Sequence, residues 1–136
     1  MWKQYKILFI ISILILSLIT SGCIFDEEEK NKISVHFKIK NNSDNHTFSN
    51  ISIILDSKEV FNKTLSFYEE GWRELDLHIN PGTHFVEAFE KDTNTSYTEK
   101  FDIKKEISIV ITYVNGTYGK HPQFYFDIYD GNKILY

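Results

Sequence analysis

Hydrophobic and polar residues alternate along most of the chain after residue 32. The first clear run places Ile33, Val35, Phe37 and Ile39 on one side of an extended backbone, with polar residues between them. This two-residue period predicts a β-strand with one buried side and one wet side. Further strands are expected at residues 51–55, 60–67, 75–79, 84–89, 97–103, 107–113 and 124–129, with a short stub at 134–136.

These runs recur about every ten residues, which is typical of a sandwich or barrel. Seven or eight short antiparallel strands cannot bury both of their faces in one flat sheet, so we expect two packed layers. The prediction is an all-β fold, an antiparallel β-sandwich of immunoglobulin-like or transthyretin-like type. Since one cysteine cannot form an internal disulfide, stability must come from the apolar interior.

One stretch carries a resemblance to known domains. It contains Leu77, Ile79, Asn80, Pro81, Gly82, Thr83, His84, Val86 and Ala88. This apolar strand, Pro-Gly turn and second alternating run resembles the hairpin of small surface β-sandwich repeats such as PEGA and the carboxypeptidase regulatory-like domains. The resemblance implies the same fold and says almost nothing about a ligand.

The start of the chain has a different pattern. Two lysines, Lys3 and Lys6, precede an uncharged and strongly apolar run from Ile7 to Phe25. A positive start followed by an apolar run is typical of an export signal, because the lysines stay in the cytoplasm while the run enters the membrane. We therefore expect the rest of the chain to lie outside the cytoplasmic membrane.

The apolar run ends in Ser21, Gly22 and Cys23, which resemble the lipobox of prokaryotic lipoproteins, although Thr20 stands where the family usually has Leu. The resemblance implies cleavage before Cys23 and lipid attachment to its thiol. Cys23 is also the only cysteine, and a lone thiol in an oxidising compartment calls for an explanation.

The alternative is an uncleaved anchor helix. The 19 uncharged residues would span about 28 Å, close to the thickness of a bilayer core. Under the lipoprotein interpretation, residues 1–22 form the signal peptide, residues 23–31 the lipidated cysteine and acidic tether, and residues 32–136 the sandwich. Both alternatives predict a domain held at the extracytoplasmic face of the cell membrane by a lipid or a helix.

The length and net charge of the chain exclude some classes of function. At 136 residues the chain is too short for a two-domain enzyme. Removing residues 1–22 takes away two lysines and no acid, so the formal net charge changes from −4 to −6. An acidic surface repels phosphates, so nucleic acid is not an expected partner.

No catalytic constellation is evident. None of the six glycines brackets a serine in a nucleophile turn, and none of the five histidines has helical zinc-ligand spacing. His78 and His84 flank one turn, but strand parity favours opposite faces. Acids and asparagines gather at residues 41–45 and 127–132, where their oxygens suit calcium, but the same residue types are the usual turn formers, which is the interpretation we favour. We therefore expect no enzyme activity, metal or cofactor.

Glycosylation sequons are unusually frequent. The part from Cys23 onward has 10 asparagines and 16 serines and threonines, so chance predicts about 1.4 sequons of the Asn-X-Ser/Thr kind. Six occur, at Asn41, Asn45, Asn50, Asn62, Asn94 and Asn115. They are candidate N-glycosylation sites, expected mostly in loops and at strand ends; the competing explanation is that these residue types gather in turns.

Aromatic residues supply the candidate ligand contacts. In the last predicted strand, Phe124 and Phe126 fall on one face and Tyr125 and Tyr129 on the other. If the first face is core, the tyrosines face outward, where they suit sugars or proteins. Together with Trp72 and Tyr118 they form the candidate set, against the simpler interpretation that aromatic residues favour strands.

The sequence thus predicts a non-enzymatic binding or structural module of the cell envelope, with an envelope protein or glycan as a candidate partner. The alternative function is capture of a glycan or small solute for a transporter or envelope enzyme. A small hydrolase is the third and least supported alternative, because no nucleophile and base can be named.

Overall fold

The computed structural model describes residues 31–44, 47–68, 72–116 and 119–131. The chain divides into two compact units, Met1–Asn31 and Lys32–Tyr136. The predicted signal peptide, Cys23 and the stub at 134–136 lie outside the described residues.

The second unit contains the eight strands that the alternation predicts. They are β1 (Ile33–Asn41), β2 (Phe48–Leu55), β3 (Lys58–Ser66), β4 (Arg73–Ile79), β5 (Gly82–Glu90), β6 (Thr95–Ile103), β7 (Ile107–Val114) and β8 (Gln123–Asp130). The boundary of β2 differs most from the expectation. This strand begins at Phe48, three residues before its expected start at Ile51, because Phe48 still pairs with Ser66 of β3.

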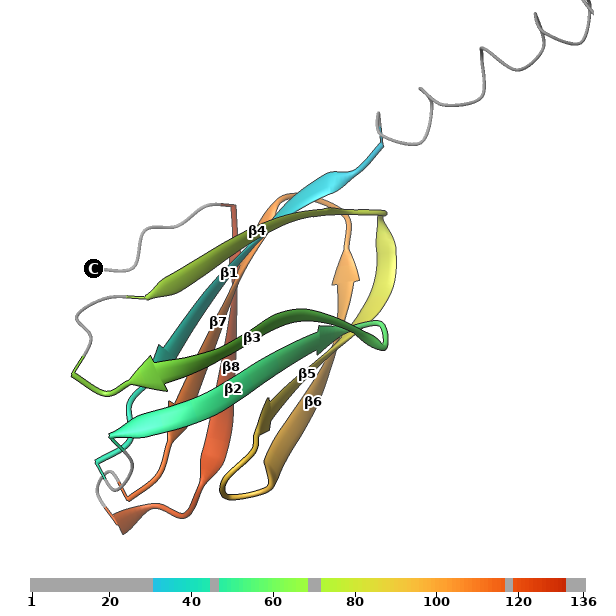
Figure 1. The fold of residues 1–136 in the computed structure, drawn as a ribbon. Coiled ribbons are helices and arrows are strands. Elements are labelled where there is room, and N and C mark those ends of the chain that lie inside the picture. Colours follow the sequence, from blue (N-terminus) through green and yellow to red (C-terminus); the bar gives the residue numbers. More distant parts are fainter. Residues whose placement is uncertain (1–30, 45–46, 69–71, 117–118, 132–136) are drawn as a thin grey trace, which may run out of the picture. The chain divides into compact units, whose positions relative to one another are not determined.

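The strands form two four-stranded sheets (Figure 1). Sheet A has the order β4-β1-β7-β8, and sheet B has the order β3-β2-β5-β6. The all-β fold is therefore confirmed. The alternating apolar residues of both sheets make up the core: Val35, Phe37, Ile39, Ile51, Ile53, Leu55, Phe61, Leu65, Val86, Ala88, Phe101, Ile103, Ile107, Ile109, Ile111, Tyr113 and Phe124.

One strand pairing differs from the antiparallel expectation. β1 runs parallel to β7, with Phe37 opposite Ile109, so sheet A is mixed. Alternation identifies the buried face of a strand but not the direction of its neighbour, and only sequence neighbours joined by a short turn are forced to be antiparallel. β7 lies in the middle of sheet A and is buried on both faces.

The Pro81-Gly82 turn also differs from the expectation. It does not close a hairpin, because β4 lies in sheet A and β5 in sheet B. The turn carries the chain from one layer to the other. A two-residue hairpin instead joins β2 to β3, where Asp56 and Ser57 have φ values of 48° and 70°. Two positive φ values are typical of a type I′ turn, whose twist matches that of paired strands.

Candidate functional site

The outer face of sheet A carries a group of charged side chains. His36 on β1 alternates with the core residues Val35 and Phe37, so its side chain points away from the core, and its antiparallel partner on β4 is Asp76. The His36 Nδ1 atom lies 2.6 Å from Asp76 Oδ1, and its Nε2 atom lies 3.1 Å from Glu106 Oε1. His36 therefore joins β1 to β4 and to the turn before β7.

The two carboxylates favour the charged imidazolium. The hydrogen bond to Asp76 is the largest cause, and it raises the pKa of His36 above its ordinary value of 6.5, with Glu106 acting in the same direction and partial burial opposing both. Since both ring nitrogens then act as donors to carboxylates, neither has a free lone pair. This histidine is placed to hold strands together and not to accept a proton.

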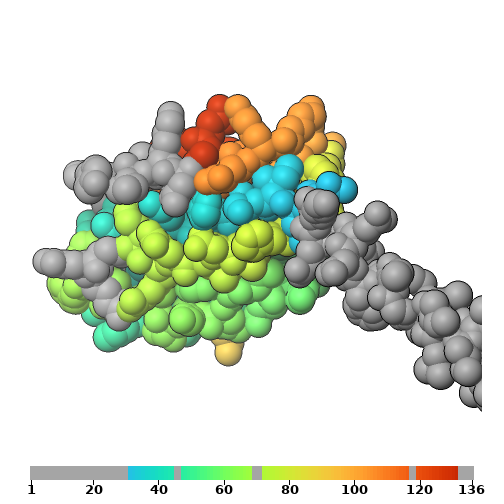
Figure 2. All heavy atoms as spheres, turned by 90° about the horizontal axis from the view of Figure 1, so that it is seen from above, coloured from blue at the N-terminus to red at the C-terminus, as the bar shows by residue number. Residues whose placement is uncertain are grey.

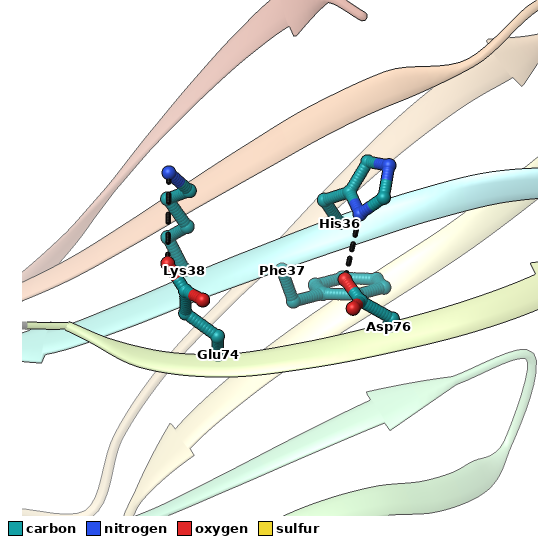
Figure 3. A pocket seen from close by; sticks show the side chains of 5 residues that line it. All are labelled: His36, Phe37, Lys38, Glu74 and Asp76. Carbon is teal, nitrogen blue, oxygen red and sulfur yellow. Dashed lines mark hydrogen bonds and ion pairs between the residues drawn. The ribbon is translucent and has the colours of Figure 1, made fainter. Parts of the chain in front are cut away.

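A second ion pair lies beside the first. Lys38 is buried, and its Nζ atom lies 3.7 Å from Glu74 Oε1 of β4. The side chains of His36, Lys38, Glu74 and Asp76 line a hollow of about 50 Å³, while Phe37 points to the core side of the sheet (Figure 3). This hollow is large enough for water molecules and far too small for a sugar or cofactor.

Ser108 comes nearest to a catalytic arrangement on this face. Its cross-strand partner on β1 is His36, but its hydroxyl donates to the carbonyl of Gly131 at 2.7 Å. It is fully buried. A nucleophile needs an accessible oxygen with a base within hydrogen-bond reach, and this serine has neither feature.

Three of the four aromatic candidates share the outer face of sheet A. Trp72 precedes β4 and is half-buried, and Lys40 Nζ lies 5.6 Å from the centre of its ring. Lys40 is opposite Thr112, which is opposite Tyr125 on β8. Trp72 and Tyr125 thus lie at the two ends of one row of outward-facing side chains that crosses the sheet. At the usual spacing between strands they are about 14 Å apart.

The other aromatic candidates are less informative. Tyr129 faces outward beside Ser108, two residues along β8 from Asp127, and it is half-buried. Tyr118 lies outside the described residues. Tyr125 is exposed, and its hydroxyl oxygen lies within 2.7 Å of Lys120 Nζ and 2.6 Å of Gln123 Nε2. The outward direction of the tyrosines is as alternation predicts.

The structure separates the sequons by accessibility. Asn41 and Asn115 are buried, and the Asn41 Nδ2 atom donates to the carbonyl of Leu65. A glycan on either side chain is incompatible with this fold. Asn50 is half-buried, and its side chain bonds to Asp92 and Thr64. The expectation that sequons lie in loops and at strand ends holds for Asn41, Asn94 and Asn115, whereas Asn50 and Asn62 lie within β2 and β3.

Two sequons present their asparagines to solvent. Asn62 is exposed on the edge strand β3, where its amide donates to Glu59 at 3.1 Å. Asn94 is exposed in the turn between β5 and β6 with a φ of 53°. Asn45 lies outside the described residues. Asn62 and Asn94 are consequently the positions where a sugar can extend into water.

The two histidines of the Pro81-Gly82 turn do not meet. His78 faces outward on β4, opposite Ser34, whereas His84 lies on β5 against the ring of Phe101 and binds Asp56. Across residues 31–131, leaving out the undescribed gaps, no group of three His, Cys, Asp or Glu side chains is placed to hold a metal ion. The same residues include no helix long and apolar enough to cross a membrane.

Sequence reasoning missed the cluster of His36, Asp76 and Glu106. Alternation could place His36 and Asp76 on outward faces, but it could not show that β1 pairs with β4, or that the turn before β7 ends beside them. Their contact depends on strand order, which has no local signal in the chain.

Comparisons with known proteins add a weak structural likeness. No family model matches the chain, and no curated protein matches it. A crystal structure of a proposed cell adhesion protein from Bacteroides ovatus is similar with a TM-score of 0.40 and 12% sequence identity, over 77% of this chain and 47% of that chain. The chain thus spans about half the length of that protein, and this degree of likeness carries no argument about function.

Proposed function

We propose that the protein is a lipid-anchored lipoprotein of the extracytoplasmic membrane face, where its β-sandwich acts as a non-enzymatic binding or structural module of the envelope. One observation carries the proposal. An uncharged apolar run ends at Ser21-Gly22-Cys23, and a separate β-sandwich begins only ten residues later, at Ile33. The acidic residues between them suit a short tether.

The arrangement of the outer face of sheet A supports a role without catalysis. The histidine there is held at both ring nitrogens by carboxylates, and the neighbouring Ser108 is buried and bonded elsewhere. These contacts join strands to one another. They are consistent with a rigid module whose exposed surface, and not a reactive group, meets its partner.

Of the two sandwich types, we propose the transthyretin-like one. Constant-type immunoglobulin domains place their first, second, fifth and fourth strands in one sheet and the third, sixth and seventh in the other. Here the first strand lies between the fourth and seventh, and the second lies between the third and fifth. This order does not match the immunoglobulin arrangement.

Fractionation with lipid labelling tests the anchor. Cells expressing wild type or Cys23→Ser are grown with a labelled fatty acid, separated into membrane and soluble fractions, and probed for the chain. We expect labelled wild type in the membrane and an unlabelled Cys23→Ser chain of higher mass that keeps its signal. Label that persists in Cys23→Ser would overturn lipidation at this residue.

A second candidate function is capture of a short glycan, favoured by the row that runs from Trp72 through Lys40 and Thr112 to Tyr125. Aromatic rings at both ends with polar groups between them suit a sugar chain lying across the sheet. The hollow beside His36 on this face is lined by other residues and is far too small for a sugar. Any glycan site on this face is therefore shallow.

A glycan array followed by calorimetry with the best oligosaccharide tests capture. Trp72→Ala and Tyr125→Ala should each weaken binding between about two- and tenfold, as expected for loss of one aromatic contact. Tyr97→Ala, on the exposed edge strand β6, is the matched control. Equal affinities in all three variants would rule out this face as the binding site.

A further inference from the structure

The sandwich has two open sides, and they differ. On one side β6 and β8 lie against each other, with the rings of Tyr97 and Phe126 5.2 Å apart. On the other side lie the edge strands β4 of sheet A and β3 of sheet B (Figure 2). A hollow of about 340 Å³ lies there, lined by Leu55, Asp56, Lys58, Val60, Leu77, His78 and Ile79. Four of these seven residues are aliphatic, so part of the core is incompletely covered along this edge.

The inward positions of the edge strand β4 are aliphatic from Leu75 onward. Leu75, Leu77 and Ile79 are opposite core-facing residues of β1, so they point inward, yet all three are only half-buried. Edge strands often avoid pairing with other chains by pointing a charge inward. β3 and β6 have such charges at Lys63 and Glu99, which are opposite the core residues Ile51 and Val86. β4 has one at its first residue, where Arg73 is opposite the core residue Ile39, and its later inward positions are uncharged.

We propose that a second copy of this chain pairs with the free edge of β4, antiparallel and with a two-fold axis at Leu77. In this register Leu77 is opposite Leu77 of the second copy, and Leu75 is opposite Ile79 in both directions. On the outer face Asp76 is opposite His78, also in both directions. The strand is thus complementary to itself in both shape and charge.

The charges select this register over its neighbours. An axis at Asp76 would bring two aspartates face to face, which is destabilising. An axis at His78 would bring two histidines together and set Leu75 opposite Pro81, so that Leu75 would lose its pairing with Ile79. Of these three axes, only the one at Leu77 joins Asp76 to His78 in both directions and keeps the three aliphatic residues opposite one another.

Pairing in this register also covers the hollow. Leu75 of the second copy would lie beside Ile79, at one wall of the hollow, and would bury apolar surface that is now half-exposed. Sheet A would become a continuous sheet of eight strands across the two copies. The inference goes beyond the proposed function and does not depend on the lipid anchor, because every residue involved lies in the unit Lys32–Tyr136.

Cysteine cross-linking in native membranes tests the pairing. Leu77→Cys in the full chain places two thiols at the axis, where directly opposite Cβ atoms lie within disulfide range. After mild oxidation we expect a covalent dimer. Wild type, which has only Cys23, is the first control and should remain monomeric.

Two further cysteine variants measure how much dimer forms at the other sheet edges. Thr98→Cys lies on β6 and Phe126→Cys on β8, each near the middle of its strand. Both should give less than roughly a tenth of the dimer, because Cα atoms more than about 7 Å apart cannot be bridged. Dimer from either position without dimer from Leu77→Cys would overturn the proposal.

A charge test on the Leu77→Cys background covers the case in which the cysteine disturbs folding. Adding His78→Asp sets two pairs of acids against each other and should lower the dimer yield several-fold, whereas adding His78→Lys should preserve it. The unfolding midpoint of each variant is measured alongside. Equal dimer yields from folded His78→Asp and His78→Lys variants would contradict the register.

Discussion

Glu90 shows how a single residue closes one end of the sandwich. Its carboxylate has no exposed surface, and it accepts hydrogen bonds from the backbone N–H groups of Asn50 and Thr93 and from the Thr93 hydroxyl. Burial raises the pKa of Glu90, but these donors together outweigh it and lower the pKa below the ordinary 4.5. The charged form is therefore the one that the fold requires.

Glu90→Gln should destabilise the domain by about 1–3 kcal/mol, because the amide nitrogen would face other donors inside the protein. Glu87→Gln, an outward-facing change on the same strand, is the control and should have a small effect. Urea unfolding measures both.

The same site predicts a dependence on pH. A lowered pKa in the folded state stabilises the protein above the ordinary pKa of 4.5, and this stability is lost as the pH falls through the lowered value. Wild type should lose stability in acid more steeply than Glu90→Gln. Parallel acid profiles for the two proteins would contradict the assignment.

A second prediction at the residue scale concerns which asparagines carry N-glycans. If the host attaches N-glycans, glycopeptide mass spectrometry should find them on Asn62 and Asn94, and Asn41 and Asn115 should remain bare, because their side chains are buried. A glycan on Asn41 or Asn115 of folded protein would contradict the packing described here. Removing only Asn62 and Asn94 should abolish the modification of both exposed sites.

At the scale of elements, His36 holds three segments together. Its raised pKa means that the stability it contributes is fully present below the ordinary value of 6.5 and is lost as the pH rises through the raised value. His36→Gln should therefore cost more stability at about pH 5.5 than at about pH 8.5. His121→Gln, at an exposed position, is the control. An equal cost at both pH values would show that the charge is not involved.

The hairpin between β2 and β3 gives a second prediction at this scale. Ser57 has a φ of 70°, where side chains with a Cβ are strained. Ser57→Gly should stabilise the domain by up to about 1 kcal/mol, the relief of strain minus the greater freedom of glycine in the unfolded chain. Thermal unfolding measures it, and destabilisation would argue against the type I′ turn.

The elements also show how far the sequence predicts the fold. The runs around Phe37 and Ile109 predict strands and their buried faces, because alternation is local. Their parallel pairing has no local signal, since about seventy residues separate them. For the same reason the Pro81-Gly82 turn reads as a hairpin although it joins two sheets. The ion pair of His36 with Asp76 depends on that missing strand order.

At the scale of the whole molecule, the chain combines a folded unit with an apolar N-terminal run that we propose to be an export signal. The core residues of the part of the chain that the structure describes all lie in the unit Lys32–Tyr136. The acidic composition of the part from Cys23 onward argues against nucleic acid partners. The function that we propose therefore depends mainly on where the domain is held, and Cys23 decides that.

The most direct test of this account is the mass of the mature N-terminal peptide, isolated from native membranes and analysed by mass spectrometry. We predict a chain that begins at Cys23 and carries a lipid on the cysteine sulfur. A chain that still begins at Met1, or an unmodified Cys23 in the membrane-bound protein, would contradict the central claim.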